Sequence, residues 1–445
     1  MPQTTWDALV IGGGPGGSSA ATFLARDGRR VLVLEKERFP RFHIGESLLP
    51  YNHSLFREMG LLPTLKAEGF IDKHGAQFVV GNGSKKLKLV FRNGRFTREP
   101  AAFQVERSRF DHVLLKHAVT SGAEIREGVT VTKFSNRGEA VSVEARDDQG
   151  NPCTFQSRFL IDASGRGNIT GNHQGIRVVH PRLKKLAVFG HFAGVRLDNG
   201  EAGGDTIIVR LENKWFWIIP LSAEKTSVGC VMDQVEFAAY KKSPEQVFNE
   251  IWESSTVMRE RMRHSRRVNE IQTASDFSYR NKRFVDHRLL RVGDAAAFMD
   301  PIFSAGVYLA MYSGKLAAKA VGESLSAGDD GAVRLRRYEK RVARGMKRYW
   351  EMVEAFYTSP FVEVFFEPRD KFDLPAAVTA LLAGELEGGW KLRWRMRLFF
   401  WIVRIQSKWT MLPRVSFSEA GAPESRIAKE VHDPVAETGA LAVKH

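Results

Sequence analysis

Residues 7–35 read DALVIGGGPGGSSAATFLARDGRRVLVLE, and this stretch decides the fold class. It begins as an apolar strand, turns through a glycine-rich segment, continues as a helix of small residues to Arg26 and ends in a second apolar strand at 31–35. A strand, a tight turn, a helix and a second strand form a complete βαβ unit. The sequence therefore predicts an α/β fold with a Rossmann-type nucleotide site at its N-terminus.

The turn of this unit carries three spaced glycines. The first permits the tight turn, the second lets the backbone approach a pyrophosphate, and the third allows close packing of helix on strand. The helix N-terminus then faces the phosphates, and an acidic residue about 20 positions later accepts hydrogen bonds from ribose hydroxyls. A glycine-rich turn without a ligand is the alternative, and the complete βαβ context argues against it. The expected nucleotide contacts of this unit are Gly12, Gly14, Pro15, Gly17, Glu35 and Lys36.

The bulk properties narrow the class of protein. The chain has 445 residues, ordinary globular composition and a formal net charge of +15. Such a charge favours an anionic partner, but no DNA- or RNA-binding motif is visible, so we expect no nucleic acid partner. The two cysteines, Cys153 and Cys230, fit neither a disulfide framework nor a metal pair. The N-terminus lacks the features of a signal peptide and no run of about 18 apolar residues occurs, so we expect a cytoplasmic protein without a membrane span.

Later segments suggest how the chain is divided. We expect residues 1–330 to form a nucleotide-binding domain, with an interleaved, sheet-containing substrate lobe at about 70–105 and 175–285. Buried strands are expected at 159–162 and 289–294, and a helix from about Gly306. Residues 331–418 are strongly helical in pattern, and 419–445 lack periodicity, which is typical of a flexible tail.

Three further motifs indicate which nucleotide cofactor the site binds. They are Val105-Glu106-Arg107-Ser108-Arg109-Phe110-Asp111, Asp162-Ala163-Ser164-Gly165 and Arg291-Val292-Gly293-Asp294-Ala295-Ala296. In this spacing, the chain resembles the FAD-dependent aromatic hydroxylases and their relatives. The resemblance implies one FAD, with Arg107, Asp162 and Asp294 at the cofactor and Asp294 on its ribityl chain. Taken singly, Arg107 or Asp294 is equally well explained as a surface ion pair or a helix cap.

Four other segments narrow the chemistry. They are HIGESLLP at 43–50, KHGA at 73–76, WFWIIP at 215–220 and DPIFSAG at 300–306. With them the chain resembles the flavin-dependent halogenases, especially the branch that acts on phenols and pyrroles, free or tethered to carrier proteins. The resemblance implies reduced FAD, dioxygen and chloride or bromide as reactants, and Trp215 and Trp217 as a shield against ordinary hydroxylation. Two tryptophans alternating on a strand also fill a core face, which is the structural alternative. The additional cofactor contacts expected from these segments are Gly45, Glu46, Ser47, Pro301 and Gly306.

Lys73 is the expected catalytic residue. In the family that the chain resembles, hypohalous acid must meet an aromatic ring, and a lysine polarises this oxidant as an ammonium or carries the halogen as a haloamine. Either role needs an amine in a largely dry passage, where burial lowers its pKa. A solvated surface lysine is the ordinary alternative.

The turn at 303–306 is the expected halide site. Ser304, Ala305 and Gly306 precede or open a helix, so backbone amides there would face an anion. The family generally has a hydroxyl residue directly before this glycine, and Ala305 departs from that pattern. The tryptophan-halogenating branch carries a glutamate beside this turn, where the present chain has Phe303, so phenol or pyrrole substrates are favoured over indole. Ser304 alternatively caps the helix.

Two features of the sequence bear on its partners: the absence of a second nucleotide-binding unit and the character of the last helix. No second glycine-rich βαβ unit follows the first, which suggests that a separate flavin reductase supplies reduced FAD. Residues 390–409 combine tryptophans at helical spacing with lysine and arginine, and predict a cationic amphipathic helix. Such a helix packs on the core, lies on an anionic membrane, docks an acidic carrier protein or lines the substrate entrance. A monooxygenase, an isoprenoid-type reductase or a non-catalytic flavin-bearing interaction protein are the competing hypotheses.

Overall fold

The computed structural model describes residues 5–369 and 371–418, and its centre is a parallel sheet. β1 (Thr5–Ile11) lies between β10 (Pro152–Asp162) and β2 (Val31–Glu35), and the strand order is β17-β18-β10-β1-β2-β7. Val10 lies opposite Val33 on one side and Ile161 on the other. The central strands are buried on both faces, which explains their unbroken apolar runs. The remaining strands are β7 (Glu124–Glu127), β8 (Thr130–Ser135), β9 (Val141–Arg146), β17 (Val285–Asp286) and β18 (Leu289–Arg291).

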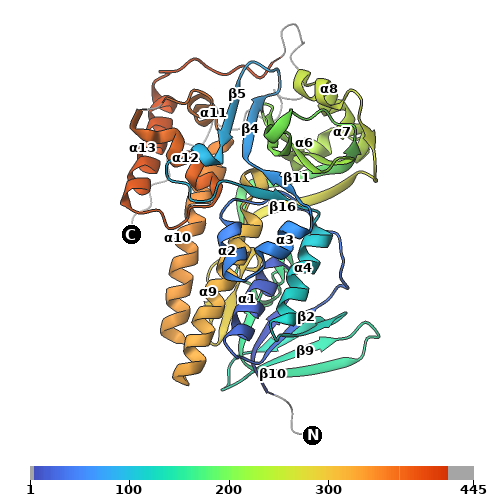
Figure 1. Ribbon diagram of the computed structural model, residues 1–445, viewed down its shortest axis with the longest axis vertical. Coiled ribbons are helices and arrows are strands. Elements are labelled where there is room, and N and C mark those ends of the chain that lie inside the picture. The colour runs from blue at the N-terminus through green and yellow to red at the C-terminus, as the bar shows by residue number, and fades with distance from the viewer. Residues whose placement is uncertain (1–4, 370, 419–445) are drawn as a thin grey trace, which may run out of the picture.

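The first helix packs against this sheet through a glycine. α1 (Pro15–Arg26) follows β1 directly, and Figure 1 shows it beside α4 (Arg107–Thr120) and α9 (Gly306–Ala327). A Cβ atom on Gly17 would lie 1.9 Å from the carbonyl oxygen of Gly12. Any other residue would push the helix away from the turn, so the third glycine of the motif fixes helix-to-strand packing.

A second sheet stands beyond the first. Its order is β19-β16-β11-β14-β13-β12-β4-β5, and its strands come from three separate parts of the chain. One face packs on the apolar side chains of two short helices at 244–253 and 256–262, and the other contributes Trp215, Trp217 and Ile208 to the main core. The strands are β4 (Gly75–Val80), β5 (Lys86–Val90), β11 (Arg177–Ala193), β12 (Thr206–Arg210), β13 (Trp215–Ser222), β14 (Lys225–Asp233), β15 (Arg266–Arg267), β16 (Gln272–Asn281) and β19 (Ala297–Phe298).

Short elements connect the two sheets. β3 (Ile71–Lys73) and β6 (Ala102–Gln104) form a separate antiparallel pair. The short helices are α2 (Asn52–Glu58), α3 (Leu62–Ala67), α5 (Ile169–His173), α6 (Gln234–Ala239), α7 (Pro244–Glu253) and α8 (Thr256–Met262). Single helical turns lie at Phe91–Asn93, Gly165–Gly167, Gly200–Gly204, Gly293–Ala295, Pro301–Phe303 and Lys371–Asp373.

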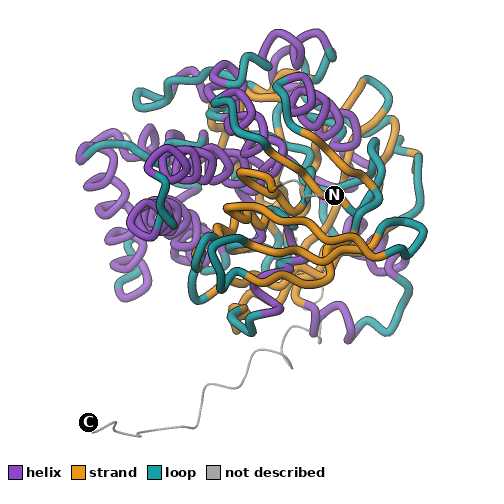
Figure 2. Tube along the Cα trace, turned by 90° about the horizontal axis from the view of Figure 1, so that it is seen from below, coloured by secondary structure: helices purple, strands orange, loops and turns teal. Residues whose placement is uncertain are grey.

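Most of the described residues between 306 and 408 are helical, as expected. α9 is followed by α10 (Ala332–Phe356), α11 (Ser359–Phe365), α12 (Leu374–Ala383) and α13 (Trp390–Lys408). Figure 2 shows most of the helices gathered to one side of the strands. Within the described ranges, no helix has both the length and the apolar character needed to cross a membrane. The tail expected at 419–445 lies outside the described residues.

α13 presents its tryptophans outward. The side chains that pack on the core are Leu392, Met396, Phe399 and Val403, at the spacing of one helix face. Trp390 and Trp401 of α13 are 66% and 57% exposed, and Trp394 is partly buried against Phe372, so the tryptophan stripe is not the main packing face. The helix has two apolar stripes, and the one that contains Phe399 packs on the core.

Candidate active site

A cavity of about 660 Å³ joins the segments that the sequence motifs marked. It runs from the β1–α1 turn past the end of β2 to the wall formed by β12 and β13, and it reaches the start of α9. Cavities of this size bind cofactors and small ligands. Its lining includes Gly12, Gly14, Pro15, Glu35, Lys36, Gly45, Glu46, Ser47, Arg107, Trp215, Trp217, Asp294, Pro301, Ser304, Ala305 and Gly306.

The nucleotide end of the cavity is held in shape by Glu35. One carboxylate oxygen accepts the backbone amide of Gly13 at 2.7 Å, and the other accepts the amide of Glu37 at 2.9 Å. These bonds fix the carboxylate against the glycine turn at the edge of the cavity. Each carboxylate oxygen retains a further acceptor position that can receive a hydroxyl proton.

Arg107 reaches the cavity from the first turn of α4. Its guanidinium binds Asp111 through two parallel bonds of 2.8 and 2.9 Å, and also donates to the carbonyl of Ile44 at 2.8 Å. The arginine is 5% exposed and Asp111 is fully buried. This bidentate pair therefore anchors the 43–47 loop at the cavity.

A second buried pair also holds this loop. The Glu46 carboxylate lies 2.8 Å from Nε2 of His191, whose Nδ1 accepts a bond from the Asn269 side chain at 3.1 Å. Nearby, burial lowers the pKa of His43 to about 3, and the charge of Arg107 acts in the same direction. His43 is therefore neutral at physiological pH.

Trp215 and Trp217 form part of the cavity wall on β13. Their rings lie 6.0 Å apart, and both side chains are at most 5% exposed. The Trp215 indole donates to the Tyr357 hydroxyl at 2.9 Å, and that hydroxyl donates to Asp300 at 2.7 Å. A Cβ on Gly229 of the adjacent strand would lie 2.2 Å from the Trp217 ring, so this glycine leaves room for the indole. The two tryptophans fill a core face and line the cavity at once.

Lys73 ends the short strand β3 and is 2% exposed. Its amine donates to the Ser47 hydroxyl at 2.9 Å and to the carbonyl of Leu48 at 3.1 Å. Ser47 is on the cavity wall, whereas Lys73 lies one side chain behind it. Burial lowers the pKa of Lys73 to about 7, and the charge of Asp205 only partly opposes this.

The Lys73 amine belongs to a chain of polar groups that leads back to the cavity. The Ser47 hydroxyl lies 2.8 Å from that of Thr206, another wall residue, and Gln104 donates to Thr206 at 2.9 Å. All four side chains are buried. Sequence reasoning did not identify Thr206 or Gln104, because isolated threonines and glutamines carry no distinctive signal.

The turn at 303–306 brings the start of α9 to the cavity. Ser304 has a φ of 55°, in the left-handed region, and it makes no side-chain capping bond to the helix. Ser304, Ala305 and Gly306 line the cavity, and Phe303 packs instead against Phe356. The helix N-terminus therefore faces the cavity without a carboxylate at position 303.

Two expected cofactor residues do not line the cavity. The Asp162 carboxylate accepts bonds from the amides of Ser164 and Thr170 and from the Thr170 hydroxyl, and so it shapes the strand-end turn. Its neighbours, residues 163–165, form the wall there. Gly17 lies behind the turn, where it acts through packing alone.

The residues present fit FAD. An open, glycine-lined helix start, an acidic group at the end of β2, Asp294 and an arginine-anchored loop all converge on a single elongated cavity. This arrangement supplies backbone donors for a pyrophosphate and carboxylates for sugar and polyol hydroxyls.

Comparison with known proteins agrees with this fold and site. Residues 5–353 match the family of FAD binding domains. The chain is 32% identical over 396 residues to a 1H-pyrrole-2-carbonyl-(peptidyl-carrier protein) brominase of Pseudoalteromonas luteoviolacea, covering 87% of this chain and 94% of that protein. It is 27% identical over 418 residues to the corresponding chlorinase of Pseudomonas fluorescens, covering 88% and 92%. A solved flavin-dependent brominase superposes with a TM-score of 0.82 at 29% identity, covering 91% of this chain and all of the other.

The class is therefore that of FAD-dependent oxidoreductases. Within that class, the chain belongs to the flavin-dependent halogenases. Their shared reactants, FAD and a halide, are those expected from the sequence.

Proposed function

We propose that this halogenase attaches chloride or bromide to an electron-rich aromatic ring, a phenol or a pyrrole, and that Lys73 handles the hypohalous acid. The observation that carries the proposal is the buried amine of Lys73, which is bonded to Ser47 on the cavity wall. Lysine side chains usually lie at the surface, because burial disfavours their charge. The burial of Lys73 therefore supports a functional role.

Gly12, Gly14, Glu35, Arg107 and Asp294 are the residues that would hold FAD in the cavity. The chemistry supplied by bound reduced FAD is a two-electron reduction that lets dioxygen, halide and a proton yield water and hypohalous acid. The acid then converts an aromatic C–H bond to a C–halogen bond with loss of water.

Lys73 has two chemically distinct ways to act on the hypohalous acid. With a pKa of about 7, both the ammonium and the free amine are populated near neutral pH. The ammonium donates a hydrogen bond that polarises the oxidant, whereas the amine exchanges an N–H for an N–halogen bond and releases water. The ring then takes the halogen and the amine regains its proton. Both routes require the water-poor surroundings that bury this side chain.

Residues of the cavity wall determine where the aromatic ring and the halide can bind. Trp215 and Trp217 line the cavity, and there they would shield a bound flavin from the aromatic ring and favour delivery through Lys73 over direct hydroxylation. Amides at Ala305 and Gly306 would hold the halide in the field of the α9 N-terminus. The backbone of Ser304, on the same turn, would form part of this halide site.

The substrate preference rests on Phe303 and on the relatives. Without a carboxylate at that turn, the ring must be activated by its own phenolate or pyrrole nitrogen. Both relatives that span nearly the full chain are named for a pyrrole-2-carbonyl group on a peptidyl carrier protein. The reduced FAD would come from a separate reductase, since the sequence has no second dinucleotide-binding unit.

The test supplies reduced FAD, oxygen and bromide or chloride with pyrrole-2-carboxyl and phenol substrates, free and carrier-bound. We expect halogenated product that depends on halide, with no NADPH required once reduced FAD is present. Hydroxylated product alone, or substrate-stimulated NADPH oxidation without a reductase, would identify a monooxygenase instead.

A further inference from the structure

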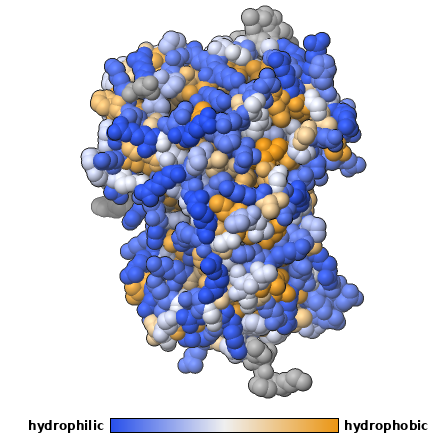
Figure 3. All heavy atoms as spheres, viewed as in Figure 1, coloured by the Kyte–Doolittle hydropathy of each residue, from blue (hydrophilic) through white to orange (hydrophobic). Residues whose placement is uncertain are grey.

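A second cavity, of about 590 Å³, lies outside the flavin site and is lined largely by cations. It is bounded by residues 333–348 of α10, Tyr312 of α9, the loop at 386–388 and the first turn of α13. Figure 1 places α10 and α13 on the same side of the molecule, and Figure 3 shows many hydrophilic side chains there. We call it the basic groove; α10 contributes Arg336, Arg337, Lys340, Arg341, Arg344 and Arg348, and α13 contributes Arg393.

The lining of the basic groove carries seven cations and a single carboxylate. Its one carboxylate, Glu387, is already bound by Arg341 and by the Tyr312 hydroxyl. Within residues 5–369 and 371–418, none of the other six cations forms an ion pair. Burial and the neighbouring charge of Arg393 lower the pKa of Arg348, with a smaller contribution from Arg344, and the nearby carboxylates of Glu385 and Glu351 oppose this shift.

The shape and charge of the groove select its partner. Like charges gathered around a hollow repel one another, and an anionic group entering the hollow relieves that repulsion. A flat lipid surface cannot enter a concave site as a protein-borne anionic group can. A carrier domain attaches its substrate arm through a phosphodiester, so it presents negative charge where the arm begins.

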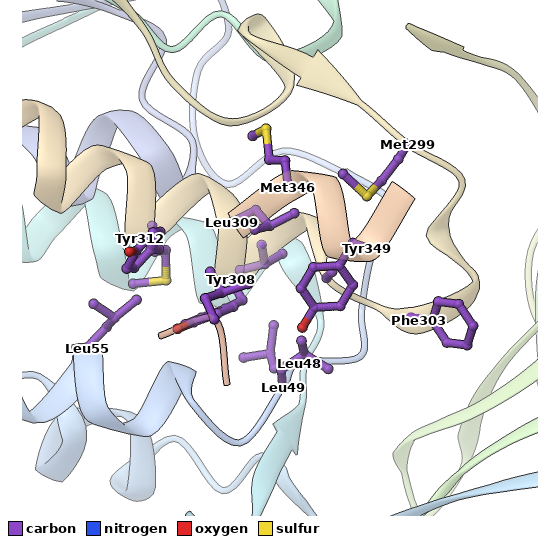
Figure 4. Close-up of a cluster of buried hydrophobic side chains, with 14 of the residues drawn as sticks. Leu48, Leu49, Leu55, Met299, Phe303, Tyr308, Leu309, Tyr312, Met346 and Tyr349 are labelled. Carbon is purple, nitrogen blue, oxygen red and sulfur yellow. The ribbon is translucent and has the colours of Figure 1, made fainter. Parts of the chain in front are cut away.

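The groove lies on the far side of an aromatic layer from Lys73. Tyr312 lines the groove, its ring is 5.9 Å from that of Tyr308, and Tyr308 is 6.4 Å from Tyr51. Tyr51 follows closely after Leu48, whose carbonyl accepts the Lys73 amine. Figure 4 shows Tyr312, Tyr308, Tyr349 and Leu48 in this one buried cluster. A series of aromatic contacts thus runs from the groove to residues 48–51, the segment whose Leu48 carbonyl accepts the Lys73 amine.

We propose that the basic groove docks the carrier protein that bears the aromatic substrate, with Arg337, Lys340 and Arg344 facing its phosphodiester and acidic side chains. This inference rests on the proposed halogenation and names the tethered form of its substrate. It assigns the groove to substrate delivery, apart from the residues that hold FAD or halide.

The experiment compares a carrier-bound with an untethered substrate. The probes are pyrrole-2-carbonyl loaded on a peptidyl carrier protein and the pantetheine thioester of the same acid, which lacks both phosphate and protein. The groove variant is Arg337→Glu/Lys340→Glu. The matched control is Lys116→Glu/Lys133→Glu, which makes the same charge change at exposed sites on α4 and β8.

At low salt, we expect the groove variant to lose about tenfold or more in kcat/KM for the carrier-bound substrate, and the loss to shrink as salt rises. Activity on the thioester should stay within about twofold of wild type, which also shows that the variant is folded. The control should match wild type on both substrates.

The outcomes distinguish a failure of the docking proposal from a failure of the halogenation proposal. Carrier binding is also measured without turnover, by fluorescence anisotropy of labelled carrier protein, so failure of the halogenation proposal leaves the groove testable. Equal use of the carrier-bound substrate by the groove variant and wild type would overturn the inference. So would an equal loss in the control, or a groove that binds phosphatidylserine vesicles but not carrier.

Discussion

Replacing Lys73 by methionine should change how the stability of the protein depends on pH. Burial lowers the pKa of this amine from the ordinary 10.5 to about 7, which corresponds to a penalty of about 5 kcal/mol on the ammonium form. The unfolded chain keeps the proton up to pH 10.5, so between about pH 7 and 10.5 it binds more protons than the folded chain. Wild-type stability must therefore rise through this window, by up to about 1.4 kcal/mol per pH unit.

Methionine does not titrate, so the Lys73→Met variant lacks this rise. Its free energy of unfolding relative to wild type should fall by about 2 kcal/mol between pH 7 and pH 9. The loss of the donors to Ser47 and Leu48 costs about 1–3 kcal/mol for each acceptor left unpaired, but this cost does not depend on pH. The prediction therefore concerns the slope with pH rather than the sign of the difference at one pH.

Urea unfolding followed by tryptophan fluorescence at pH 6, 7, 8 and 9 measures this slope. Lys116→Met, at an exposed site on α4, serves as control and should show a constant difference from wild type. A constant difference for Lys73→Met as well would mean that its amine has an ordinary pKa, and the description of Lys73 as a buried, tunable group would be wrong.

Three further predictions concern residues that line the cavity or pack behind its walls. Gly17→Ala places a Cβ 1.9 Å from a carbonyl oxygen, so melting temperature and bound FAD should both fall markedly, whereas Gly138→Ala, in open surroundings, should leave both unchanged. Gly229→Ala forces the Trp217 indole to move and should destabilise the protein by about 1–3 kcal/mol in urea unfolding; wild-type stability with normal FAD content would contradict the packing described. Because His43 stays neutral down to about pH 3 when folded, wild-type stability should drop as pH falls below 6.5. The His43→Gln variant should show a smaller drop between pH 6.5 and 4, and parallel curves would refute the buried neutral histidine.

Local chemistry explains why much of the fold was predictable. The β1–α1–β2 unit is contiguous, and its glycines act on backbone only a few residues away, so spacing alone predicted the turn and the place of Glu35. The strand at 159–162 and the helix from Gly306 were also predicted. The strand expected at 289–294 is present but ends at Arg291, and a helical turn follows at Gly293–Ala295. Both strands could be recognised because buried parallel strands are continuously apolar. The capping box at Ser243 and Gln246 marked the start of α7, yet this helix was not predicted.

Contacts between distant segments account for what the sequence could not show. Arg107 is engaged by Asp111 and by the loop carbonyl of Ile44, and only the tertiary structure brings that loop to α4. Tyr357, which joins Trp215 to Asp300, lies over 140 residues from the tryptophan and belongs to no motif. On α13, periodicity revealed an amphipathic helix but not which of its two apolar stripes packs inward.

The most direct test of the central claim is product analysis of wild type and Lys73→Met, each loaded with FAD and supplied with reduced FAD, oxygen and bromide. We predict that the variant retains its FAD and consumes oxygen but forms no brominated aromatic, while wild type brominates the ring. Bromination by Lys73→Met at the wild-type rate would show that the buried amine does not handle the oxidised halogen.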